Sequence, residues 1–133
     1  MKTIKRGELE RFILPGRMIQ KAVGKESQSK SQRMTMGFAT YSAEYGLMEP
    51  HNHAEEICYV ISSEDGWLRK GPEKDQLGEK IHLEPGMTLH IPPLEWHVFE
   101  YGPGGHVDII FFYGQVDHIR PEEMEIEKAD QKE

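Results

Sequence analysis

Cysteine is almost absent from this sequence, which excludes a fold held together by disulfide bonds. The 133 residues include one cysteine, Cys58, so no intramolecular disulfide can form. Cys58 lies inside the apolar run 57–61, where a buried free thiol is the ordinary expectation. A chain without structural disulfides suits a reducing compartment, and we therefore expect a cytoplasmic protein.

Long apolar runs and an excess of positive charge are also lacking. No apolar stretch approaches the length of a membrane span, and the basic first residues are not followed by the apolar segment of a signal peptide. The 16 lysines and arginines are outnumbered by 23 aspartates and glutamates, which gives a net charge of -7 with neutral histidines. We expect a soluble protein that binds neither nucleic acid nor an anionic membrane surface.

Glycine and proline, by contrast, are well represented. The 13 glycines and 8 prolines fall between short runs of β-branched and aromatic residues, a pattern typical of many short antiparallel strands. Turns are expected at residues 63–66, 84–86 and 102–105. The pattern predicts strands at residues 17–23, 34–42, 47–53, 56–62, 67–70, 79–83, 87–92, 96–101 and 106–113.

The C-terminal residues differ from the rest of the chain. From Pro121 onward, acidic residues follow a proline that suits a first helical position, which predicts a short helix or a tail. Many strands with hardly any helix indicate an all-β fold that closes into a barrel or sandwich, because closure removes exposed sheet edges. We expect one domain over residues 1–133, with the barrel core at about 17–114 and a C-terminal extension at 115–133.

A cluster of histidines and carboxylates marks the segment before the fourth predicted strand. His51 and His53 are two residues apart, so in an extended chain both imidazoles project from one face and can bind the same ion. Glu55 or Glu56 can add a carboxylate oxygen, and His97 is the best candidate for a further ligand. Nitrogen and oxygen ligands without thiolate suit divalent Fe, Mn, Co, Ni, Cu or Zn.

Two stretches of the chain carry a resemblance to a known family. Residues 46–61 read Gly-Leu-Met-Glu-Pro-His-Asn-His-Ala-Glu-Glu-Ile-Cys-Tyr-Val-Ile, and residues 86–97 read Gly-Met-Thr-Leu-His-Ile-Pro-Pro-Leu-Glu-Trp-His. Their order and spacing resemble the two sequence motifs of a small single-domain cupin. The resemblance implies a double-stranded β-helix, or jelly-roll, barrel. It also implies one divalent transition metal held by His51, His53, Glu56 and His97.

Two departures from the cupin pattern bear on this site. Only two residues separate His53 from Glu56, one fewer than the shorter family spacing, and Leu94 stands where the second motif has a glycine. Glu56 aligns best with the family's carboxylate ligand, because the residues after it match the family's strand. Glu55 and Glu49 remain open as alternatives.

Other side chains near the motifs are candidates for a ligand pocket, namely Cys58, His90, Trp96 and Glu55. For His90, a hydrogen-bonded interior position or an outward one competes with a place in the pocket. Arg17 and Lys21, four residues apart on the first predicted strand, can bind a carboxylate or phosphate group. We expect them instead to be a basic pair on the outside of an edge strand.

The cupin resemblance leaves the function open, since this fold serves many reactions. It favours a metal-dependent enzyme, an isomerase or dioxygenase, acting on a small polar metabolite such as a sugar, sugar acid or keto acid. The alternative is a non-catalytic module that senses or binds a small molecule or a metal. We also expect a homodimer, because cupins of this size commonly pair and the aromatic stretch 106–113 offers an apolar surface.

Overall fold

The architecture is a single, mainly antiparallel sheet that bends over on itself. A computed structural model describes residues 1–116, and the predicted C-terminal helix lies outside them. The strands are β1 (Phe12–Leu14), β2 (Arg17–Gly24), β3 (Ser29–Lys30), β4 (Thr35–Ser42), β5 (Glu56–Gly71), β6 (Ile81–His82), β7 (Thr88–Ile91) and β8 (Trp96–Tyr113). Two short 3-10 helices, η1 (Arg6–Glu8) and η2 (Ala43–Tyr45), complete the described elements. The all-β prediction is confirmed.

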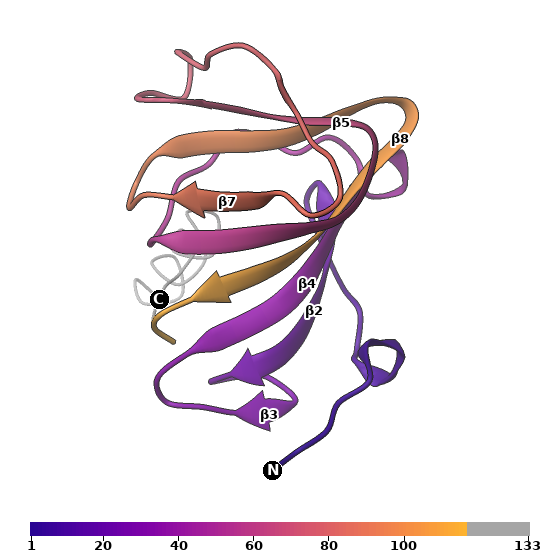
Figure 1. The fold of residues 1–133 in the computed structure, drawn as a ribbon, viewed down its shortest axis with the longest axis vertical. Coiled ribbons are helices and arrows are strands. Elements are labelled where there is room, and N and C mark those ends of the chain that lie inside the picture. The colour runs from indigo at the N-terminus through magenta and orange to yellow at the C-terminus, as the bar shows by residue number, and fades with distance from the viewer. Residues whose placement is uncertain (117–133) are drawn as a thin grey trace, which may run out of the picture.

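The strands pair in the order β1-β2-β4-β8-β5-β6, with β7 added to β5 and the short β3 parallel to β2. In Figure 1, β7, β5, β8, β4 and β2 lie side by side, and β5 and β8 curve over together at one end. The sheet order is far from the order along the chain, so most contacts join segments that are distant in sequence. This crossing connectivity is the pattern of a jelly-roll barrel.

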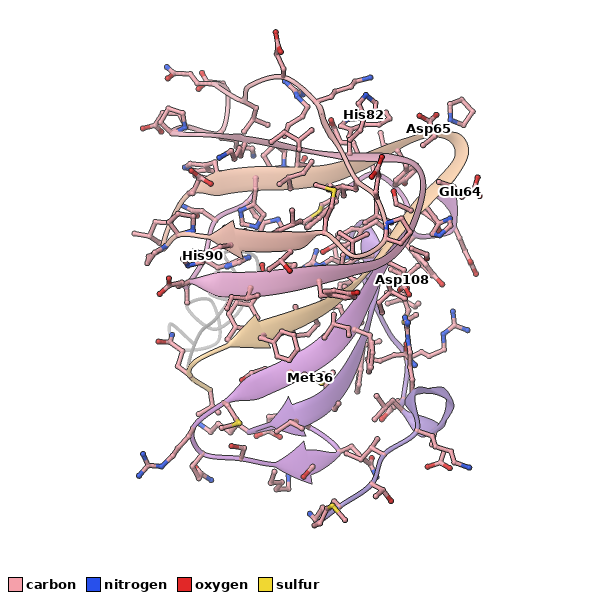
Figure 2. All side chains as sticks on the ribbon, in the orientation of Figure 1. Met36, Glu64, Asp65, His82, His90 and Asp108 are labelled. Atoms are coloured by element: carbon pink, nitrogen blue, oxygen red, sulfur yellow. The ribbon has the colours of Figure 1, made fainter. Side chains whose placement is uncertain are left out.

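β5 and β8 are each one long strand where the sequence predicts two strands and a turn. They pair from Ile57 opposite Phe112 to Gly71 opposite Trp96, with irregular register between Glu64 and Gly66. The predicted turns at 63–66 and 102–105 are therefore bends inside paired strands, and Figure 2 shows Glu64 and Asp65 at that place. Glycine permits the close approach, since a Cβ on Gly105 would lie 2.5 Å from the Glu64 carbonyl oxygen.

The predicted strand at 47–53 is wrong. The segment is irregular, and only His51 pairs, through an isolated bridge to His97. Pro50 within the segment has no N–H to donate to a neighbouring strand. The bridge consists of two 3.0 Å hydrogen bonds, from His51 N to His97 O and from His97 N to His51 O. These bonds fix the histidine segment directly onto the start of β8.

The core lies on the inner face of the bent sheet. In β5 the burial alternates, with Glu56, Cys58 and Val60 buried and Ile57 and Tyr59 exposed. This is the face assignment that strand alternation predicts. The apolar core consists of Ile19, Ala39, Tyr41, Met48, Cys58, Val60, Leu68, Leu83, Ile91, Val98, Phe99, Val107, Ile109, Phe111 and Tyr113. Within residues 1–116, no helix is long and apolar enough to cross a membrane.

Candidate metal centre

The segment 51–53 and the start of β8 are tied together by hydrogen bonds, which brings their histidines to one place. The backbone bridge between His51 and His97 is continued by a 2.8 Å hydrogen bond from Leu94 N to His53 O. The Asn52 side chain adds a bond from Nδ2 to Leu94 O at 3.2 Å. Leu94 adopts a left-handed backbone with φ of 66°, the conformation that the glycine of the cupin motif would adopt without strain.

Three imidazoles converge where segment 51–53 meets the start of β8. His51, His53 and His97 each offer one ring nitrogen, and these nitrogens all lie within 4.8 Å of one another. The three residues are buried, with exposed fractions of 5%, 4% and 1%. Neighbouring rings have centroids 4.6 to 5.1 Å apart. The structure therefore brings together histidines that are up to 46 positions apart in the sequence.

The hydrogen bonds of the outer ring nitrogens determine which nitrogen can bind an ion. His53 Nδ1 lies 2.8 Å from Ala54 O, and His97 Nδ1 lies 2.8 Å from Glu95 O. A carbonyl only accepts, so each Nδ1 carries the proton and each Nε2 presents a lone pair. The two Nε2 atoms face each other at 3.1 Å. A proton or a metal ion shared between the two nitrogens is compatible with that distance, and a pair of imidazole Nε2 atoms is a donor set that fits a metal ion.

One of the three candidate carboxylates lies beside the histidines. Glu56 is 3% exposed, and its Oε1 is 3.4 Å from His53 Nε2. The Glu49 side chain is 86% exposed and pairs with Lys74 at 3.6 Å. The Glu55 side chain points to the outside, where its Oε2 lies 2.6 Å from His90 Nε2. The two adjacent glutamates therefore differ in burial. Glu56 is the first residue of β5, and its side chain lies on the inner face of the sheet.

The remaining pocket candidates are distributed differently. Cys58 is fully buried and follows Glu56 on the inner face of β5. His90 and Glu55 have side chains exposed by 63% and 57%, so placing them in the pocket is wrong. Figure 2 labels His90, which is a residue of β7. Leu89 and Ile91 take the inner positions of β7 and leave His90 outside. Trp96 is half-buried and precedes His97, so strand alternation turns the two side chains to opposite faces.

Tyr113 is a core residue whose ring lies edge-on to His53, with centroids 5.4 Å apart. Arg17 was expected on the outside of an edge strand, but it is buried with 2% exposed. Side chains on both faces of β2 are covered. The sequence of this strand therefore does not alternate between apolar and polar residues, and it does not show which side chains point inward.

Several solved structures are similar to this chain over most of its length. The chain resembles the polyketide cyclase RemF from Streptomyces resistomycificus, at 24% identity and a TM-score of 0.67, over 91% of this chain and 82% of that one. It resembles a cupin-like protein from Thermotoga maritima at 18% identity and a TM-score of 0.58, over 75% and 69% of the two chains.

A third similar structure is a variant of oxalate decarboxylase from Bacillus subtilis, at 14% identity and a TM-score of 0.64. That match covers 86% of this chain and 29% of the decarboxylase. No protein-family profile and no curated protein sequence matches the chain. The bent antiparallel sheet, the converging histidines and these structural neighbours together show that the chain has the cupin fold.

Proposed function

We propose that this protein is a metal-dependent cupin enzyme that acts on a small polar metabolite. The observation that carries the proposal is the convergence of three buried histidines, with ring nitrogens within 4.8 Å of one another. Three imidazole nitrogens and the adjacent Glu56 carboxylate form a nitrogen and oxygen donor set that suits a divalent transition-metal ion. We propose that His51, His53, His97 and Glu56 hold such an ion.

The metal would be one divalent transition ion among Fe, Mn, Ni, Co, Cu and Zn, the ions that suit nitrogen and oxygen ligands. When bound, such an ion supplies Lewis-acid chemistry or, if it is redox-active, an oxygen-binding site. The chain's own groups prepare the site. The backbone carbonyls of Ala54 and Glu95 hold His53 and His97 in one tautomer and orientation. The buried Glu56 offers a carboxylate oxygen 3.4 Å from His53 Nε2.

The surroundings favour chemistry away from bulk water. Phe111 and Tyr113 are 4% and 2% exposed, their rings contact each other, and Tyr113 packs edge-on to His53. Electrostatic effects are strengthened in such a water-poor environment. The similar solved structures support this proposal, since two of them are a polyketide cyclase and an oxalate decarboxylase. Isomerisation and oxygenation are the reaction classes that we propose to test first.

The decisive experiment follows conversion of sugars, sugar acids, keto acids and catechols by the metal-loaded protein, with oxygen uptake recorded in parallel. We expect turnover of at least one class by the wild-type protein. The His51→Ala, His97→Ala double variant should lose that turnover, whereas the matched surface variant His90→Ala should retain it. Oxygen consumption would assign the reaction to oxygenation, and its absence to isomerisation or related chemistry. Binding across the panel without conversion would contradict the enzyme and favour a non-catalytic binding module.

A further inference from the structure

An aromatic side chain from the far end of β8 reaches the histidine cluster. Tyr113 is the last residue of β8, whereas His97 is the second residue of the same strand. The Tyr113 ring lies edge-on to the His53 ring, with centroids 5.4 Å apart and an interplanar angle of 75°. Because β8 bends over (Figure 1), its two ends meet at His53, one with a histidine and the other with a tyrosine.

The position of Tyr113 is fixed by the sheet and by the core. Its strand lies between β4 and β5, with Tyr113 opposite Thr35 on β4 and the preceding Phe112 opposite Ile57 on β5. The side chain is 2% exposed, and its ring packs edge-on to Phe111 with centroids 5.8 Å apart. A close-packed side chain of this kind has little freedom to change its rotamer.

His53, by contrast, lies in an irregular segment. Its Nδ1 donates to the carbonyl of the next residue, Ala54, at 2.8 Å, and a bond between neighbouring residues moves together with the segment. The ring contacts of His53 are with His51, His97 and Tyr113. The two histidines are themselves proposed ligands, whereas Tyr113 belongs to the fixed centre of the sheet. The tyrosine ring therefore gives the His53 imidazole a rigid surface to pack on.

The same tyrosine is a cross-strand neighbour of the candidate carboxylate. Ile57 lies opposite Phe112, and extending this antiparallel register by one residue sets Glu56 opposite Tyr113. Both side chains are buried, and directly opposite residues on one face of a sheet have Cβ atoms about 4.5–5.5 Å apart. Glu56 Oε1 is in turn 3.4 Å from His53 Nε2. Tyr113 is thus next to both partners of that contact.

We infer that Tyr113 is a positioning residue that holds the His53 ring in the orientation required for metal binding. A ligand that already has its binding orientation loses little freedom when the ion arrives, which raises the metal affinity. The aromatic ring is the part that acts, because the ring is what packs against His53. This inference rests on the proposed function, because it takes His53 as a metal ligand.

Binding of Co²⁺, followed by competition with a chromogenic chelator and by the visible absorption of the bound ion, tests the inference. We expect Tyr113→Leu to weaken Co²⁺ binding about ten-fold or more and to change the absorption bands, because the orientation of His53 is no longer fixed. Tyr113→Phe keeps the ring and should retain both the affinity and the spectrum. Tyr41→Leu is the matched control, since Tyr41 is also 2% exposed but its ring stacks on Phe99. This control should lose stability and keep the wild-type spectrum.

A measurement on the wild-type protein keeps the inference testable if Tyr113→Leu does not fold. Nuclear magnetic resonance of the metal-free and the Zn²⁺-loaded protein should show the same Overhauser contacts between the His53 and Tyr113 rings. Contacts that form only after Zn²⁺ is added would overturn the inference, because the ion and not the tyrosine would then orient the imidazole.

The outcomes separate this inference from the proposed function. Wild-type affinity and spectrum in Tyr113→Leu, or an equal loss in Tyr113→Phe, overturn the inference alone. A spectral change of the same size in Tyr41→Leu also overturns it, because the effect would then come from general loss of core packing. A wild type that binds none of the candidate ions overturns both the proposed function and the inference.

Discussion

At the scale of single residues, burial decides which of several plausible groups belongs to the site. Glu55 and Glu56 are adjacent and chemically identical, yet one is paired with His90 at the surface and the other lies 3.4 Å from His53. The short gap between His53 and Glu56 does not prevent this arrangement, because the chain between them is an irregular turn rather than a strand. Glu56 therefore lies beside the histidines although its spacing from His53 is shorter than that of the cupin motif.

Replacing Glu56 tests its role as a metal ligand. We expect Glu56→Gln to weaken metal affinity by about ten-fold or more, since a carboxylate is replaced by a neutral, weaker donor. Glu55→Gln and Glu49→Gln serve as matched controls and should leave affinity unchanged, because both side chains are exposed. Competition with a chromogenic chelator provides the measurement. Equal affinities for the wild type and Glu56→Gln would mean that the three histidines suffice.

Individual site residues differ in how well the sequence predicts them. The pattern His-x-His followed by a distant histidine was enough to identify the converging set of His51, His53 and His97. The position of Arg17 could not be read in the same way, because Met18 and Gln20 on the opposite face of β2 are buried too. A strand covered on both faces gives no alternating pattern, so sequence alone cannot say which side chains point inward.

At the scale of elements, the N-terminal segment explains why the outer face of β2 is covered. Arg6 in η1 forms two hydrogen bonds with the Asp108 carboxylate, at 2.6 and 2.7 Å. Its Nε donates to Gln20 Oε1 at 3.0 Å, and its guanidinium lies 4.5 Å from the centre of the Phe38 ring. The hydrogen bond to Asp108 raises the pKa of Arg6 above its ordinary value. One arginine thus joins η1 to β2, β4 and β8.

A double-mutant cycle tests this contact. We expect Arg6→Met and Asp108→Asn each to lower the free energy of unfolding by about 1–3 kcal/mol, because a partly buried, charge-assisted pair is broken. The coupling energy should be about 1–2 kcal/mol. Chemical denaturation provides the values, with the exposed Lys74–Glu49 pair as the control, for which coupling should be near zero. Additive effects of the Arg6 and Asp108 variants would contradict the account.

The sequence predicts correctly that the elements are strands, but it does not show where one strand ends and the next begins. Most predicted strands exist, but 56–62 and 67–70 are parts of β5, and 96–101 and 106–113 are parts of β8. Glycine normally marks a turn, whereas here Gly66 and Gly105 allow two paired strands to bend in close contact. Deciding between a turn and a bend requires knowledge of the partner strand, which is remote in the sequence. The short β1 and β3 carry too few residues to show a pattern.

At the scale of the whole molecule, part of the outer face of the sheet is apolar and exposed. Ile57, Tyr59 and Phe112 are 46%, 43% and 40% exposed. Ile57 lies opposite Phe112, which lies opposite Met36 on β4, and Figure 2 labels Met36 on that strand. Neighbouring exposed apolar side chains on one sheet face commonly mark a contact surface between proteins.

The homodimer remains a prediction, and we expect the exposed side chains of Ile57, Tyr59 and Phe112 to form its contact surface. We expect light scattering to give twice the chain mass at micromolar concentration. Ile57→Lys and Phe112→Lys should each shift the protein toward monomer, because a charge would be buried at the contact. Leu47→Lys is the matched control, since Leu47 is 82% exposed and lies outside this group of residues. A wild-type monomer at that concentration would rule out the predicted dimer.

The central claim about the whole molecule is that its barrel is built around one metal ion held by histidines. Elemental analysis by mass spectrometry, on protein purified without chelator and supplemented with each candidate ion, tests that claim most directly. We predict close to one transition-metal ion per wild-type chain and a loss of that ion in the His51→Ala, His97→Ala double variant, with His90→Ala unchanged. Wild-type protein that remains metal-free after every supplementation would contradict the claim.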